Sequence, residues 1–107
     1  MVDNRHTYYY NFKMDVVFNF NYEKNLKLIN GRGISFEQII SLIRDGKVID
    51  VLAHYNQDQY GSQKIDVIDV EGYCYLSTVP FVEREDEIFL KTIIPSRKMT
   101  KLYMRQK

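Results

Sequence analysis

The sequence predicts an α+β fold in which two N-terminal helices pack on one face of an antiparallel sheet of four to five strands, followed by a short basic helix. Apolar residues recur with the helical period in the first half of the chain and with a period of two in the second half. Short connections between the later segments favour antiparallel neighbours. With 107 residues, we expect one domain over residues 14–107 behind an extension of residues 1–13.

Two helices are predicted near the start of the domain. Asn21 is expected to cap a helix over residues 22–30, with Gly31 at the left-handed position that ends it. Ser35 and Gln38 have the spacing of a capping box, which predicts a second helix from Phe36 to about Asp45. Its apolar residues fall on a single stripe, as expected for a helix that covers a core.

The strands are predicted from alternation and from turn residues. Glu71-Gly72 is expected to form a tight turn and the acidic segment 83–87 a longer one. Pro80 cannot donate to a strand ladder, so its strand should bulge or lie at an edge. Lys64, Asp66 and Lys91 interrupt apolar runs, which predicts one mixed, solvated face of the sheet. The predicted strands are Val16–Phe20, Val48–Ala53, Lys64–Val70, Tyr73–Val82 and Ile88–Ile94.

The C-terminal segment collects positive charge in a chain of net charge +1. Ser96 is expected to cap a short helix whose cations lie on one side, with Met99, Leu102 and Tyr103 facing inward. This separation of charge indicates a polyanionic partner, although a plain solvated helix face is an equally good interpretation. The cations after Pro95 are Arg97, Lys98, Lys101, Arg105 and Lys107.

Several function classes are poorly supported. The two histidines, His6 and His54, have no second ligand at a metal-binding spacing, so neither a metal nor a cofactor is expected. Cys74 lies alone in an apolar run and is expected to be a small core residue in a reducing compartment. No apolar stretch has the length of a membrane span or a secretion signal, so we expect a cytoplasmic protein without membrane contact.

The remaining bases and cations fit metal-free RNA cleavage, which needs proton-transfer groups and cations that stabilise the phosphorane. The candidate catalytic residues are His54, Lys64, Lys91 and Arg97, and the candidate RNA-binding residues are Lys98, Lys101, Tyr103 and Arg105. Each candidate also has a structural interpretation. A histidine at a strand end is commonly solvated, and lysines beside or within strands protect sheets from aggregation.

Four segments resemble the BrnT-like toxins of bacterial type II toxin–antitoxin pairs. The similarity extends over about Val17 to Tyr103, and the helix entry together with the terminal Ser-Arg-Lys-x-Thr motif makes it fairly specific. The segments are Phe20–Asn25, Arg32–Glu37, Lys64–Ile65 and Phe89–Thr100.

The resemblance implies a RelE-like fold and a metal-independent endoribonuclease toxin that arrests growth by cleaving RNA. It implies a cognate antitoxin encoded alongside, of a DNA-binding type such as ribbon-helix-helix, that forms a hetero-oligomer with the toxin. By position, the functional basic residues of the family fall on Lys64, Lys91 and Arg97, with His54 as a companion. The alternative is a degenerate toxin fold that docks an antitoxin or repressor partner without cleaving RNA.

Overall fold

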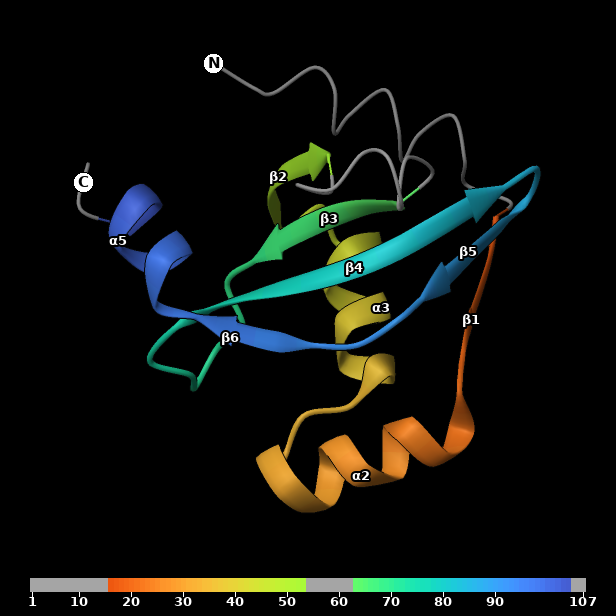
Figure 1. Ribbon diagram of the computed structural model, residues 1–107, viewed down its shortest axis with the longest axis horizontal. Coiled ribbons are helices and arrows are strands. Elements are labelled where there is room, and N and C mark those ends of the chain that lie inside the picture. The colour runs from red at the N-terminus through yellow and green to blue at the C-terminus, as the bar shows by residue number, and fades with distance from the viewer. Residues whose placement is uncertain (1–15, 54–62, 105–107) are drawn as a thin grey trace.

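The computed structural model is an α+β fold, described for residues 16–53 and 63–104 (Figure 1). The predicted extension of residues 1–13 lies outside these ranges. None of the helices in the described ranges has the length and apolar character needed to cross a membrane. In chain order the described elements are β1 (Val17–Phe20), α2 (Tyr22–Arg32), α3 (Phe36–Arg44), β2 (Val48–Ala53), β3 (Gln63–Ile68), β4 (Leu76–Arg84), β5 (Glu87–Leu90), β6 (Ile94–Ser96) and α5 (Arg97–Met104).

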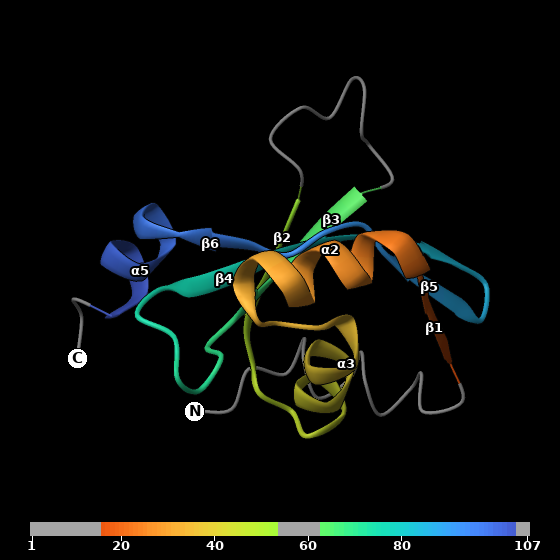
Figure 2. The ribbon, with the colours of Figure 1, turned by 90° about the horizontal axis from the view of Figure 1, so that it is seen from below.

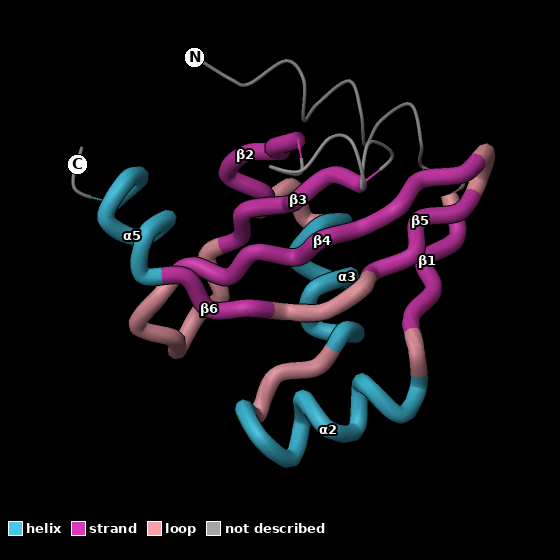
Figure 3. The backbone as a smooth tube through the Cα atoms, viewed as in Figure 1, coloured by secondary structure: helices cyan, strands magenta, loops and turns pink. Residues whose placement is uncertain are grey.

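The described strands form a mixed, six-stranded sheet in the order β1-β5-β4-β3-β2, with β6 paired to β4 (Figure 3). The expectation of an antiparallel sheet is therefore wrong at one edge, where β1 pairs with β5 in parallel. This happens because β1 leads into α2 and α3 rather than into a hairpin. The two helices carry the chain to the opposite edge, and the meander of β2 to β5 then returns it to β1.

The main core lies between α3 and one face of the sheet, called here the helix face, whereas α2 runs along the edge of the sheet beside β5 and β6 and adds Leu28 to the core (Figure 1, Figure 2). The expectation that both N-terminal helices pack on one face is therefore met only for α3. α3 lies behind the sheet in Figure 1 and beneath it in Figure 2. The ring of Phe36 is fully buried and stacks on Phe20 with centroids 4.9 Å apart. The largest fully buried side chains of this core are Phe36, Phe81, Ile34, Ile39, Ile43, Ile68, Ile88, Leu90 and Ile93.

The first helix is longer than the sequence predicts. α2 continues through Gly31 to Arg32, and Gly33 takes the left-handed conformation with φ of 70°. The backbone N–H of Gly33 donates to the carbonyl of Ile29 over 2.9 Å. Gly31 costs about 1 kcal/mol inside the helix relative to alanine, which is small enough to be tolerated. The helix therefore continues past Gly31 and is ended by Gly33, which takes the left-handed conformation.

The predicted start of α3 is confirmed, and a buried amide ties it to α2. The capping box of Ser35 and Gln38 is present in both directions. Asn25 is 2% exposed, accepts from the N–H of Phe36 over 2.7 Å, and donates to the carboxylate of Glu37 over 2.8 Å. These bonds satisfy a free N–H of the first turn of α3 and place an anion at its positive end.

Acid should weaken this corner. The Asn25 amide first, and then backbone and Ser35 hydrogen bonds, hold the pKa of Glu37 below its ordinary value of 4.5. A depressed folded pKa contributes stability above the unfolded pKa, and that contribution is lost as the pH falls through the folded value. In urea unfolding, the stability difference between the native protein and Glu37→Gln should shrink between about pH 6 and about pH 3. A difference that is constant over this range would contradict the assignment.

The hairpins differ from the predicted turns in two places. The Glu71-Gly72 turn is confirmed, with Gly72 at φ 92°, but β4 begins at Leu76 rather than at Tyr73. Cys74 lies in the bend between them and is exposed, so its prediction as a core residue is wrong. The acidic connection is shorter than expected, because the register pairs Arg84 with Glu87 and leaves only two residues in the turn.

Pro80 coincides with an interruption in the neighbouring strand. The N–H of Lys91 donates to the Pro80 carbonyl over 2.8 Å, but Pro80 has no N–H to return the bond. Leu90 pairs with Phe81 and Ile94 with Thr78, so residues 91–93 lie opposite only two residues of β4. One extra residue in the partner strand is a β-bulge. Lys91 therefore lies just after the end of β5. The prediction that it lies in the middle of a strand over residues 88–94 is wrong.

Candidate functional site

The opposite side of the sheet carries the candidate site and is called here the open face. Thr78, Pro80 and Val82 alternate with the core residues of β4 and point away from α3. All three side chains are partly exposed. By the strand register, the same face includes Asp50, Leu52, Ile65, Val67, Glu87, Phe89 and Ile94.

α5 packs at one end of the open face. The hydroxyl of Tyr103 donates to the Asp50 carboxylate of β2 over 2.7 Å, and the Thr100 hydroxyl accepts from the N–H of Leu76 in β4 over 2.7 Å. The predicted Ser96 cap is confirmed by its 3.1 Å bond from the N–H of Met99. The expectation that Leu102 faces inward is wrong, because it is 51% exposed. Tyr103 does pack inward, as predicted, and Thr100 makes the second contact.

Over β4 and β5, the open face combines a cation with an aromatic ring. Lys91 and Phe89 line a shallow hollow together with Val82, Arg84 and Glu87. The Lys91 ammonium lies 5.8 Å from the centroid of the Phe89 ring, which is partly exposed. An ammonium beside an exposed ring offers a phosphate contact and a stacking surface for a base in one place.

A second cation and ring occur where β6 enters α5. The guanidinium carbon of Arg97 lies 5.6 Å from the ring centroid of Tyr75, which is 37% exposed. Lys98 and Lys101, two of the predicted RNA-binding residues, are also exposed on α5. The six steps from Lys91 to Arg97 span at most about 20 Å of chain. This length is an upper limit on the separation of the two Cα atoms, so one bound strand can reach both cations.

Lys64 lies apart from Lys91. It pairs with the core residue Phe81, so it alternates onto the helix face, and its ammonium lies 4.0 Å from the Glu83 carboxylate. Asp66 shares that face and is 1% exposed. Of the three charged residues predicted on one solvated face, only Lys91 is on the open face. The expectation that Lys64 and Lys91 share one patch is therefore wrong.

The remaining predicted residues have different outcomes. His54 and Arg105 lie outside the residues that the structure describes. Tyr103 is described, but its hydroxyl is engaged with Asp50. Sequence reasoning missed Arg84, an exposed residue that lines the hollow with Lys91. Its place two residues after Val82 in a strand of alternating burial is the signal that could have found it.

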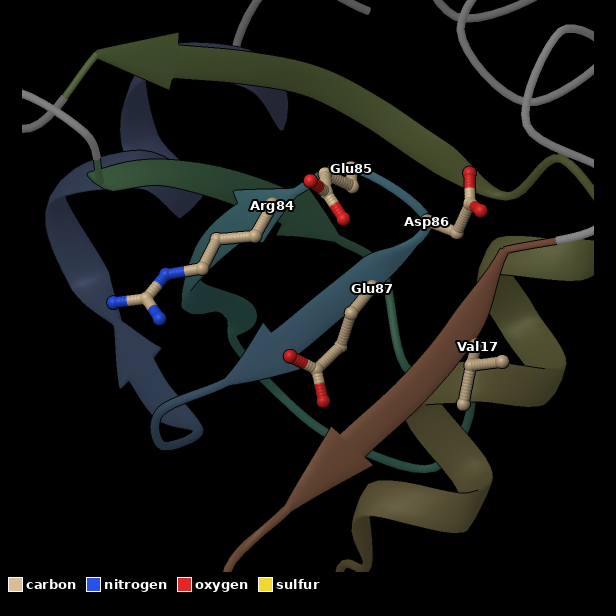
Figure 4. Close-up of a pocket in the computed structure, with 5 residues that line it drawn as sticks. All are labelled: Val17, Arg84, Glu85, Asp86 and Glu87. Atoms are coloured by element: carbon tan, nitrogen blue, oxygen red, sulfur yellow. The ribbon is translucent and has the colours of Figure 1, made fainter.

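The acidic residues gather at the far end of the sheet from α5. Figure 4 shows Glu85, Asp86 and Glu87 around the β4–β5 turn, with Val17 of β1 beside them and the Arg84 side chain extending away from the tip. Glu87 accepts a hydrogen bond from the Asn19 side chain of β1. The separation of charge in the sequence thus becomes a separation along β4, with the cations of α5 at the opposite end (Figure 1).

Within residues 16–53 and 63–104, no group of three or more histidine, cysteine or acidic side chains is arranged to hold a metal ion. No family model, curated protein or solved structure matches the chain. The features of this chain that bear on its function are therefore the open face and the resemblance in sequence.

Proposed function

We propose that the protein is a toxin of a type II toxin–antitoxin pair, a metal-independent endoribonuclease with a RelE-like fold that receives single-stranded RNA on its open face. The observation that supports this most strongly is the pairing of a cation with a partly exposed ring at two places, Lys91 with Phe89 and Arg97 with Tyr75. Cations that track a backbone beside rings that stack bases are the usual elements of single-strand binding.

The residues divide into roles by position. Arg97 contributes a planar guanidinium at the start of α5, where two of its N–H groups can bind one phosphate and stabilise its developing charge. Lys91 binds a neighbouring phosphate as a point charge. Lys98 and Lys101 extend the positive surface along α5. His54, a candidate catalytic residue from the sequence, takes the role of proton carrier in this proposal.

Incubation of the purified protein with single-stranded RNA in excess EDTA tests this function. The proposal predicts fragments that end in a 2′,3′-cyclic phosphate, because a metal-free reaction uses the 2′-hydroxyl as nucleophile and expels the 5′-oxygen. RNA with 2′-O-methyl riboses should bind without being cut. Intact RNA at every protein concentration would refute the enzyme.

A second candidate is a docking module that binds an antitoxin or repressor without cleavage. The specific observation in its favour is that Lys64 and Lys91 lie on opposite faces of the sheet, so these two predicted catalytic cations cannot clamp one phosphate. In this case the basic residues of α5 would contact an acidic antitoxin segment. The EDTA experiment separates the candidates, since a docking module gives no RNA fragments. Such a module should still form a stable complex when it is mixed with the antitoxin.

A further inference from the structure

We infer that Arg32, at the end of α2, is a positioning residue that sets where Lys91 stands on the open face. The inference rests on the proposed function, because it assigns a purpose to the placement of Lys91. Arg32 itself would not touch RNA. It acts through residues 91–93, the bulge that joins β5 to β6.

The bulge decides which side chains face the core. Lys91 lies on the open face, whereas Ile93 is fully buried on the helix face. In a regular strand, residues two apart share a face, so these two could not be separated in this way. The extra residue permits both placements, and it also brings Ile94 onto the open face opposite Thr78. Straightening the bulge would turn Lys91 inward or expose Ile93.

Backbone carbonyls at the bulge accept hydrogen bonds from side chains, because the neighbouring strand does not supply all the donors. Pro80 lies opposite Lys91 and cannot donate a backbone hydrogen bond. The Arg32 guanidinium donates to the carbonyl of Ile93 over 2.7 Å, and the Thr78 hydroxyl donates to the carbonyl of Ile94 over 3.1 Å. Arg32 therefore links the end of α2 directly to the irregular backbone, and its bond is charge-assisted, the stronger kind.

Arg32 is itself held in place. The hydroxyl of Tyr73 donates to the Arg32 carbonyl, and the following residue, Gly33, ends α2 in the left-handed conformation. The helix end, the Tyr73 hydroxyl and the guanidinium thus meet at one corner beside the bulge. This corner offers a reason why α2 extends past Gly31, because a helix that ended there would not place residue 32 at this point.

The test compares Arg32→Met, which keeps the aliphatic stem but removes every donor, with Arg32→Lys, which keeps one donor. Hydrogen exchange of the amides from Lys91 to Ile94 should accelerate in Arg32→Met and return toward the native rate in Arg32→Lys. Binding of 2′-O-methyl RNA should weaken by up to about fivefold in Arg32→Met, the upper end of the range expected when one exposed ionic contact is lost.

A double-mutant cycle identifies the residue through which Arg32 acts. Arg32→Met should add almost no loss of binding in a Lys91→Ala background, and should keep its full effect in a Lys101→Ala background. Equal losses in both backgrounds, or unchanged amide exchange, would overturn the inference. If the native protein binds no RNA, the proposed function fails, while the exchange rates still decide whether Arg32 holds the bulge.

Discussion

Replacing Phe36 with alanine should lower the free energy of unfolding by about 3 to 5 kcal/mol. The ring is fully buried at the first turn of α3 and stacks on Phe20 of β1, so its loss leaves a cavity between the helix layer and the edge strand. Among the described strands β1 pairs only with β5, so any inward movement of this edge strand would fill part of the space and bring the loss toward the lower end of the range. Urea unfolding measures the change.

Phe36→Leu is the matched control for the ring, since it retains most of the apolar volume. It should cost clearly less than Phe36→Ala, because the cost rises with the cavity that remains. Tyr22→Ala controls for the loss of an aromatic side chain at the surface, because Tyr22 is 70% exposed. Its unfolding free energy should stay within about 0.5 kcal/mol of the native value. Equal losses at positions 22 and 36 would contradict the described core.

Replacing Arg97 with alanine should slow RNA cleavage by about 10²- to 10³-fold at saturating RNA, the usual effect of removing one contact to the developing charge. Arg97 is exposed on the first turn of α5, so the substitution should leave the fold intact. In cells, expression of Arg97→Ala should permit growth where the native chain arrests it.

Lys98→Ala provides the control, because Lys98 is the adjacent exposed cation and carries only a binding role in the proposal. It should raise the RNA concentration that gives half-maximal cleavage without lowering the maximal rate, which is the signature of uniform binding. If Arg97→Ala behaves in the same way as Lys98→Ala, the charge-stabilising role of Arg97 is wrong. Toxicity that survives Arg97→Ala would count equally against it.

The parts of the fold that sequence reasoning predicted well depend on local chemistry. The capping box at Ser35 and the limits of β2 agree with the structure because neighbouring residues decide them. The predicted end of α2 is wrong because Gly31 and Gly33 both fit the left-handed position that ends a helix, and in the structure Gly33 occupies it. The parallel pairing of β1 with β5 joins segments far apart in the chain, which no local pattern specifies.

The candidate site shows the same limit. Alternation within one strand is visible in a sequence, but the face to which a lysine points depends on the register with other strands. Lys64 faces Phe81 in one ladder, whereas Lys91 follows a bulge opposite Pro80. Their separation therefore could not be read from the two segments alone. The basic character of α5 depends on neighbouring residues, and there Arg97, Lys98 and Lys101 are exposed as expected.

Charge reversal at two lysines tests most directly the claim that the open face receives the RNA. Lys91 and Lys64 are both exposed on adjoining parts of the sheet, but they point to opposite faces. Binding of 2′-O-methyl RNA should fall sharply in Lys91→Glu and stay close to the native affinity in Lys64→Glu. Loss of binding in Lys64→Glu with retention in Lys91→Glu, or equal losses in both, would contradict this account.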